Sequence, residues 1–274
     1  SRLSRRIALL EERLGVRLIQ RSSRRFAVTE VGQVYLAHCQ AMLVEADAAE
    51  EAIAATHAEP CGTVRMSCPV LLLDLRVAAM LADFMAAYPR VEVHLEDTNR
   101  RVDLVGEGLD LALRVRPAPL EDSDLVLRVL GESRQCLVAA PRLLEGRAPL
   151  RTPADLAGLP SLDLGLPHDA HIWRLRGPEA ARAEVPHHPR LVTRSMGALC
   201  AAAVAGVGVA QLPWMLVAAQ VARGELVRVL PGWAPQHELI HAVLPSRRGL
   251  LPAVRALLDH LAARFAALPE DEAP

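Results

Sequence analysis

Apolar residues recur at helical spacing at the start of the chain. Four of them lie four, three and four positions apart, which places them on one face of a helix: Leu3, Ile7, Leu10 and Leu14. The opposite face and the flanks of this stripe are polar and carry Ser1, Arg2, Ser4, Arg5 and Arg6. Gly15 follows the last apolar residue directly and is expected to end the helix.

Two short runs with strand propensity, residues 16–19 and 26–29, follow this helix and are joined by a polar, cationic segment. The pattern predicts a hairpin with arginines at its tip. A helix with arginines opposite its apolar face, followed by such a hairpin, is typical of a winged helix-turn-helix, which places the helix in the major groove and the wing on phosphates. The residues expected to contact double-stranded DNA are Ser1, Arg2, Ser4, Arg5, Arg6, Arg21, Arg24 and Arg25. The alternative is an ordinary surface helix with solvated arginines.

The charge distribution favours contact with DNA over a plain surface helix. The first 32 residues hold eight Arg and three Glu, a net charge of +5, whereas the whole chain has −1. The remaining residues therefore carry −6. Such an asymmetry indicates a segment that binds nucleic acid, attached to a neutral-to-acidic body.

A single long helix is predicted from residue 29 to about residue 56. Thr29 is a candidate N-cap, and the apolar stripe that follows is narrow and bordered by acidic residues. A helix of this length with a narrow seam is better covered by a partner helix than by a globular core. The residues expected in the dimerisation seam are Val31, Tyr35, Met42, Ala46 and Ile53. The alternative is a helix that packs on its own chain.

Beyond a short Pro–Cys–Gly linker, strand and helix patterns alternate, which predicts an α/β fold with mostly parallel sheets. Strands are expected at 63–68, 91–97, 111–115, 125–130, 136–140, 161–164, 190–193, 207–212, 226–229 and 238–243. Helices are expected at 73–88, 100–108, 153–157, 196–205, 214–223 and 251–268. The chain is expected to cross from a first α/β set to a second near Ala140 and to return near Trp233.

The sequence resembles LysR-type transcriptional regulators. The N-terminal signature is carried by Ile7, Leu10, Glu11, Leu14, Gly15, Leu18, Arg21, Arg25, Thr29 and Gly32, and further similar segments continue to residue 248. The resemblance implies that the chain begins inside the recognition helix, so that the first two helices of the DNA-binding domain are absent. It also implies that the long helix pairs two subunits into a homodimer or tetramer, and it admits RNA polymerase as a further partner.

The resemblance also implies the domain organisation. Residues 1–29 form a partial winged helix-turn-helix and residues 30–57 a linker helix. Residues 63–268 form a periplasmic-binding-protein-like effector-binding domain. Within it, subdomain I comprises about 63–140 and 236–268, and subdomain II about 141–235. Ligands of such open sheets bind in the crevice at the carboxyl ends of the strands.

The effector site can be outlined from the resemblance. One wall is the turn after the first strand, where Pro69, Val70, Leu71 and Leu72 replace the small hydroxyl residues common in the family. The other wall is the start of the helix after residue 193, with Arg194, Ser195 and Met196, and Arg116 lies near the hinge. These arginines predict an acidic small-molecule effector, a carboxylate with an apolar body. The alternatives are aliphatic residues of the plain core and arginines solvated at the rim.

The sequence gives less support to disulfides, a metal site or enzymatic activity. Five scattered cysteines without a CxxC motif argue against a disulfide framework or a zinc finger, and favour the cytoplasm. His168, His171, His187 and His188 raise the possibility of a metal, but their spacing does not place a ligand set on one element. No nucleophile–base pair or pair of carboxylates indicates an enzyme, and no cofactor or membrane span is expected.

The sequence therefore predicts a LysR-type transcriptional regulator that is controlled by a small effector. The main alternative is a solute-binding protein with the same α/β module and no DNA function. Residues 1–32 discriminate between the two, because a solute-binding protein has no use for an arginine-faced helix and a wing.

Overall fold

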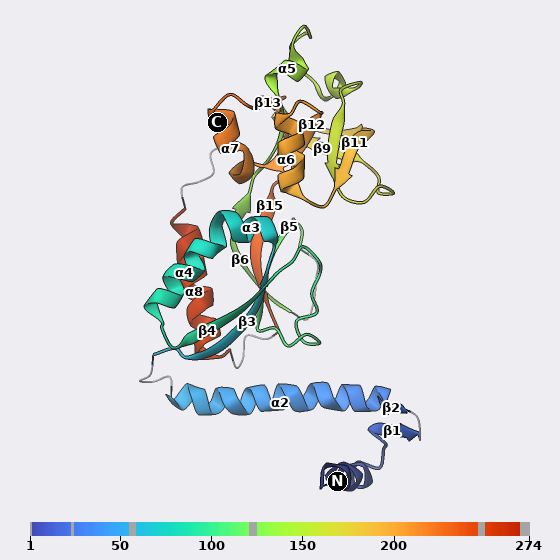
Figure 1. Ribbon diagram of the computed structural model, residues 1–274, viewed down its shortest axis with the longest axis vertical. Coiled ribbons are helices and arrows are strands. Elements are labelled where there is room, and N and C mark those ends of the chain that lie inside the picture. The colour runs from blue at the N-terminus through green and yellow to red at the C-terminus, as the bar shows by residue number, and fades with distance from the viewer. Residues whose placement is uncertain (1, 23–24, 55–58, 121–124, 246–249, 269–274) are drawn as a thin grey trace.

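The computed structural model describes residues 2–22, 25–54, 59–120, 125–245 and 250–268 of the chain. Two α/β subdomains are stacked end to end, and the long helix α2 lies across the far end of the first (Figure 1). The N-terminal helix and hairpin lie beyond α2. The predicted α/β class with two subdomains is confirmed, whereas several element boundaries differ from the prediction.

The N-terminal segment folds into a helix and a two-stranded hairpin. The elements are α1 (Arg2–Leu14), β1 (Ile19–Ser22) and β2 (Arg25–Val28), with β1 antiparallel to β2. The first strand begins at Ile19, so the prediction of a strand at 16–19 is wrong. A carboxylate oxygen of Glu11 accepts hydrogen bonds from the backbone N–H groups of Leu18 (2.8 Å) and Ile19 (2.9 Å). These bonds tie the connection to α1, and pairing starts only after it.

The helix α2 (Glu30–Ala54) begins where the sequence predicts. The Thr29 hydroxyl accepts the backbone N–H of Gly32 at 3.0 Å, which is an N-cap to the third helical residue. Within the predicted seam Tyr35 is half-buried, but Val31 and Met42 are 53% and 66% exposed. These two side chains are therefore not covered by their own chain. The side chains of Ala46 and Ile53 lie outside the described residues.

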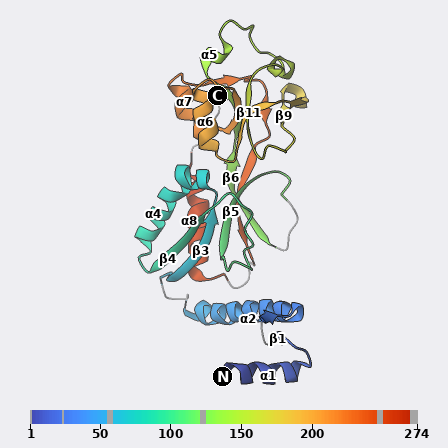
Figure 2. The same cartoon turned by 45° about the vertical axis from the view of Figure 1, so that its right-hand side comes forward.

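Subdomain I is built on a five-stranded mixed sheet and comprises residues 62–133 and 238–266. The strand order is β4 (Val91–Asp97), β3 (Gly62–Cys68), β5 (Leu111–Pro117), β15 (Glu238–Leu244) and β6 (Val126–Ser133). The first three strands are mutually parallel, and β15 is antiparallel to both of its neighbours. One face packs against α4 (Ala78–Ala87) and α8 (Pro252–Ala266), as Figure 2 shows.

Subdomain II, residues 135–235, repeats this arrangement. Its five-stranded sheet has the order β11 (Pro189–Thr193), β8 (Ser161–Leu164), β12 (Val209–Pro213), β7 (Gln135–Ala139) and β13 (Val227–Val229). As in the first sheet, two pairs of neighbouring strands are parallel and two are antiparallel. One face packs against α6 (Met196–Val204) and α7 (Trp214–Ala222). Both sheets are thus mixed rather than mostly parallel, because the strands that cross between them run antiparallel to their neighbours.

The opposite face of the second sheet is covered by a three-stranded antiparallel sheet that the sequence analysis did not predict. Its strands are β10 (Arg182–Pro186), β9 (Ile172–Arg176) and β14 (Ala234–Pro235). Trp173 and Leu175 of β9 point into the core between the two sheets. Short helical segments complete the subdomain: α5 (Pro141–Leu144) and the 3₁₀ turns Pro153–Leu156 and Pro178–Ala180.

The chain crosses between the subdomains earlier than predicted. Strand β6 ends at Ser133 in the first sheet, and β7 begins at Gln135 in the second, so only Arg134 separates them. The predicted strand at 136–140 therefore belongs to subdomain II, and the crossing is not near Ala140. The chain returns between Pro235 and Glu238.

Two helix predictions in subdomain I need correction. The helix predicted from residue 73 begins with α3 (Val70–Leu72) and passes through the π-helical turn η1 (Leu73–Val77) into α4. The helix predicted at 100–108 is absent, and the segment forms turns. Gly106 and Gly108 disfavour a helix there, and the Glu107 carboxylate accepts the backbone N–H of Asp103 at 2.8 Å, which competes with helical hydrogen bonding.

The Gly206–Gly208 turn between α6 and β12 gives a direct test of the packing. A Cβ atom on Gly208 would lie 2.8 Å from the backbone oxygen of Pro160, whereas one on Gly232 would meet nothing within 4 Å. We expect Gly208→Ala to cost about 1–3 kcal/mol in urea unfolding, the usual range for overpacking. The control Gly232→Ala should stay within about 0.5 kcal/mol. Equal stability of the two variants would contradict the close approach of β12 to β8.

Candidate functional site

A cavity of about 590 Å³ opens between the two subdomains. Its walls come from the end of β3 and the start of α3 on one side, and from the start of α6 on the other. The eight residues that the sequence analysis assigned to an effector all border it: Pro69, Val70, Leu71, Leu72, Arg116, Arg194, Ser195 and Met196. Segments more than a hundred residues apart in sequence thus meet around one space.

The wall in subdomain I is apolar, but its members differ in role. Pro69 caps the helix that begins at Val70, and Val70 is partly exposed toward the mouth of the cavity. Leu72 is 3% exposed and packs into the core beneath the helix. For Leu72 the plain-core alternative and the cavity wall therefore both hold.

The wall in subdomain II is polar and cationic. The Ser195 hydroxyl accepts the backbone N–H of Ala198 at 3.2 Å and so caps α6. Ser195 also donates its own N–H to the Thr193 hydroxyl at 3.2 Å, which fixes the turn. Arg194 is exposed, and no carboxylate in the described ranges pairs with it. Its guanidinium remains available to an anion at the mouth of the cavity.

The floor of the cavity lies at the crossing between the subdomains and was not predicted. Gln135, the first residue of β7, donates its side-chain amide to a carboxylate oxygen of Glu238, the first residue of β15, at 3.0 Å. Burial raises the pKa of Glu238, and the positive charge of Arg116 lowers it in part. Arg116 itself is exposed and donates to the backbone oxygen of Val115 at 2.8 Å. The floor thus joins the two subdomains through one side-chain hydrogen bond.

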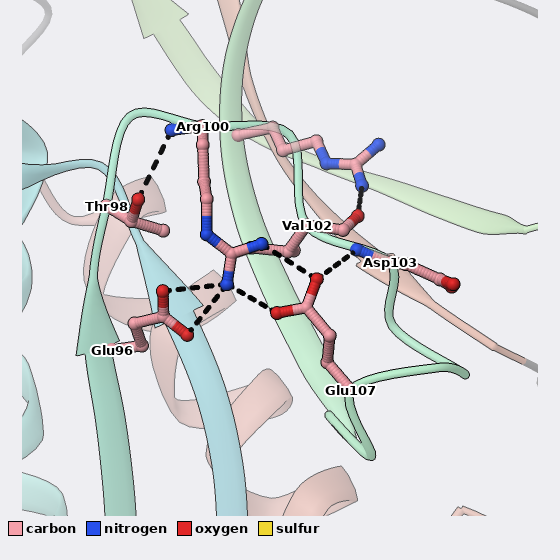
Figure 3. Close-up of polar contacts among 7 residues, drawn as sticks. Glu96, Thr98, Arg100, Val102, Asp103 and Glu107 are labelled. Carbon is pink, nitrogen blue, oxygen red and sulfur yellow. Dashed lines mark hydrogen bonds and ion pairs between the residues drawn. The ribbon is translucent and has the colours of Figure 1, made fainter. Parts of the chain in front are cut away.

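A charge cluster centred on Arg100 lies beside the cavity (Figure 3), and Arg100 is its one charged member that lines the cavity. The Arg100 guanidinium donates to Glu96 at 2.9 Å and to Glu107 at 2.8 Å. These bonds, with the N–H of Asp103, lower the pKa of Glu107 to about 2. Arg100 borders the cavity but is already engaged by two carboxylates, so it is poorly suited to bind a further anion.

The predicted DNA-contacting residues lie on the N-terminal helix and hairpin. Arg5 and Arg6 are exposed on α1. Arg2 and Ser4 also lie on α1, Arg21 on β1 and Arg25 on β2. Ser1 and Arg24 lie outside the described residues.

Two histidines of subdomain II, His171 and His187, pack against strand β8. His171 Nδ1 lies 2.6 Å from a carboxylate oxygen of Asp163, and His187 Nδ1 lies 2.8 Å from the Ser161 hydroxyl. The His187 ring also stacks on Trp173 at 4.0 Å between centroids. In the part of the chain that the structure describes, no three His, Cys, Asp or Glu side chains form a group that could hold a metal ion. These contacts fasten the three-stranded sheet to β8.

The cysteines carry no visible chemistry. All five are free, and Cys68, Cys136 and Cys200 are buried. Burial raises the pKa of Cys68 to about 12 and that of Cys136 to about 11, so both are protonated thiols at neutral pH. Among the described helices, none combines the length and the apolar character that crossing a membrane requires.

Comparison with known families gives matches along most of the chain. The family described as LysR substrate binding domain matches residues 57–266. The family described as bacterial regulatory helix-turn-helix protein, lysR family, matches residues 1–33. An HTH-type transcriptional regulator of Xanthomonas campestris is 34% identical over 267 residues, which are 96% of this chain and 77% of the relative.

Solved structures show the same architecture. The full-length virulence activator AphB of Vibrio cholerae is similar with a TM-score of 0.65 and 26% identity, over 95% of this chain and 88% of AphB. CrgA of Neisseria meningitidis, a LysR-type transcriptional regulator, gives a TM-score of 0.65 and 27% identity, over 96% of this chain and 88% of CrgA.

The buried carboxyl at the floor makes stability depend on pH. Because burial raises the pKa of folded Glu238, the unfolded chain loses this proton first as pH rises, and the folded state then loses stability. The glutamine in Glu238→Gln cannot ionise. The melting temperature of this variant minus that of the unaltered protein should therefore be larger at about pH 8 than at about pH 4. Glu132→Gln removes an exposed carboxylate from the neighbouring strand β6 and is the matched control. A pH-independent difference for Glu238→Gln would contradict the burial of an ionisable carboxyl.

Proposed function

Because the chain belongs to the LysR family of bacterial transcriptional regulators, we propose that a small acidic molecule in the cavity between its subdomains controls its contacts with DNA. It is a DNA-binding regulator with an effector-binding domain. The match of residues 1–33 to the helix-turn-helix family disfavours the alternative, a solute-binding protein without DNA function.

One observation carries the proposal: the residues selected from the sequence on both sides border a single cavity. A ligand there would contact α3 of subdomain I and α6 of subdomain II at the same time. It would favour the angle between the subdomains at which both contacts are made. In an assembly of subunits this angle sets the spacing of the DNA-binding segments, and so the bend of the bound DNA.

The acidic character of the effector is inferred from charge. Arg194 has an exposed guanidinium at the mouth, beside the start of α6, where helix N–H groups favour an anion. Arg116 adds a second positive charge near the hinge. Val70, Leu71 and Met196 provide an apolar surface for the body of the molecule. A carboxylate with an apolar body fits this combination.

The remaining partners follow from the same function. Arg5 and Arg6 would contact base edges from α1, with Arg2 and Ser4 beside them, and Arg21, Arg24 and Arg25 would hold phosphates from the hairpin. The exposed seam of α2 would pair with a second subunit, giving a homodimer or a tetramer. RNA polymerase is a further proposed partner, and the protein would act in the cytoplasm, where bacterial DNA lies, without enzymatic activity.

A thermal-shift screen against small carboxylates tests the proposal. A ligand that binds only the folded state raises the melting temperature in proportion to the logarithm of its concentration. We expect carboxylates with an apolar body to stabilise the protein, and uncharged amides of the same shape to have a much smaller effect. Stabilisation by the amides alone would exclude an acidic effector.

The role of Arg194 can be measured on any carboxylate that binds. Arg194→Ala should weaken binding by about 1.5–3 kcal/mol, the range for a hydrogen bond to a charged group. This is roughly ten- to a hundredfold in dissociation constant by calorimetry. Arg190→Ala, on β11 outside the cavity lining, is a matched control and should have no effect. Unchanged affinity in Arg194→Ala would show that this arginine is only a solvated rim charge.

A charge placed in the apolar stripe of α2 tests whether two subunits pair through this helix. Met42→Glu places a carboxylate in the proposed interface and should weaken pairing on the order of tenfold or more, because an unpaired buried charge is costly. Gln40→Glu adds the same charge at an exposed position outside the apolar stripe and should pair normally. Light scattering at micromolar concentration distinguishes the two. Equal pairing of both variants would place the interface elsewhere.

Variants of Arg5 and Arg25 distinguish contacts with bases from contacts with phosphates. Arg5→Ala should reduce discrimination between operator and random DNA, because this side chain lies opposite the apolar face of α1. Arg25→Ala should weaken binding to all DNA sequences similarly. It should also lower the slope of the logarithm of affinity against the logarithm of salt concentration by about one, as expected for a phosphate contact. Fluorescence anisotropy with both DNAs decides between the roles, and identical effects of the two variants would refute them.

A further inference from the structure

The floor of the cavity has more hydrogen-bonding capacity than the protein uses. Five polar or charged residues are buried in the described part of the chain, and Ser67, Ser133 and Gln135 among them border the cavity. Within the described ranges no group hydrogen-bonds the hydroxyl of Ser67 or Ser133. Neither hydroxyl oxygen is among the described side-chain atoms that are buried without a partner, so both oxygens are accessible from the cavity. These hydroxyls are therefore free to hydrogen-bond a polar group of a molecule that enters the cavity.

Three of the floor residues are brought together by the crossing itself. Ser133 ends β6 and lies directly opposite Glu238, which begins the antiparallel neighbour β15. Gln135 follows after one residue and donates to one oxygen of Glu238 at 3.0 Å. The other carboxylate oxygen of Glu238 receives no hydrogen bond from the described residues. The floor thus offers a hydroxyl and a carboxylate oxygen side by side, on the strands that connect the subdomains.

We propose that the effector carries, besides its acidic group, a hydroxyl or amino group that hydrogen-bonds Glu238 and Ser133 at the floor of the cavity. The effector class is therefore a hydroxy- or amino-substituted carboxylate, with its acid toward Arg194 and its donor toward Glu238. This inference rests on the proposed function, because it takes the cavity to be the effector site.

The chemistry of Glu238 makes it a specificity-determining residue. A donor group satisfies its free oxygen, whereas an apolar group of the same size would exclude solvent from Glu238 and Ser133 and leave both unpaired. A second carboxylate at the floor would be repelled by like charge. Because Glu238 belongs to subdomain I and its partner Gln135 to subdomain II, a ligand group bound here also touches the hinge between them.

The test compares matched ligand pairs by calorimetry. The probes are benzoate with its hydroxy- and amino-substituted forms, and butanoate with its hydroxy- and amino-substituted forms. We expect a substituted member to bind about tenfold or more tightly than its parent, the scale of one buried hydrogen bond. Equal or weaker binding of every substituted member would overturn the proposal.

Variants assign the preference to the floor. Glu238→Gln and Ser133→Ala should each bring the ratio of parent to substituted affinity close to one, whereas Glu132→Gln, outside this cavity, should keep it. Arg194→Ala should weaken both members of a pair equally and leave the ratio unchanged. A ratio that survives Glu238→Gln overturns the proposal. If Arg194→Ala leaves the affinity of both members unchanged while the ratio still depends on Glu238, the acidic group of the proposed effector is contradicted, but its hydroxyl or amino group is not.

The role of the Ser133 hydroxyl can also be measured without a ligand, by thermal unfolding. Ser133→Ala removes a hydroxyl that lines the cavity and has no partner among the described residues, so the melting temperature should stay the same or rise. The matched control Ser161→Ala removes a fully buried hydroxyl that lies 2.8 Å from His187, and should lower it. A Ser133→Ala variant as destabilised as Ser161→Ala would show that the hydroxyl is structural, which overturns the proposal.

Discussion

The structure depends on one continuous extended segment that belongs to two sheets. Strand β6 pairs with β15 in subdomain I, and after the single residue Arg134 the same segment pairs with β12 and β13 in subdomain II. Each subdomain has its own apolar cores. The backbone hydrogen bonds within each sheet can therefore stay intact while the angle at the crossing changes, and a hinge needs this property.

The position of the cavity follows from this crossing. The strands β3 and β5 end toward the second subdomain, and α6 begins facing the first, so that helix starts and strand ends surround one space. The crossing strands form the floor and bring Ser133, Gln135 and Glu238 into contact with that space. A molecule bound there meets rigid elements of both subdomains together with the hinge. Occupancy and inter-subdomain angle are then physically coupled, and the proposed control of DNA contacts requires such a coupling.

The sequence predicted what depends on local pattern. The helix α1 and the Thr29 cap of α2 follow from spacing and capping rules, and the structure confirms them, as it confirms most of the predicted strands and helices beyond residue 62. The resemblance to a family located both cavity walls. The strands β9 and β10 were missed although Trp173 and Leu175 alternate with Arg174 and Arg176, a pattern that indicates a half-buried strand.

Other features could not be predicted because they depend on distant partners. The Gln135–Glu238 hydrogen bond joins residues 103 positions apart, and nothing local marks either residue as a site. The segment 100–108 has helix-compatible spacing, but the Arg100–Glu96–Glu107 cluster and two glycines hold it in turns. The crossing at Arg134 was misplaced because β6 and β7 differ in sheet membership rather than in sequence pattern.

The central claim is that one ligand contacts both subdomains at the cavity. Hydrogen exchange with mass spectrometry, on the protein with and without a carboxylate that raises its melting temperature, measures this directly. We expect slower exchange in two distant segments at once, the helical start at residues 70–77 and the α6 start at residues 196–200. Slower exchange in only one subdomain, or only in surface segments away from the cavity, would contradict it.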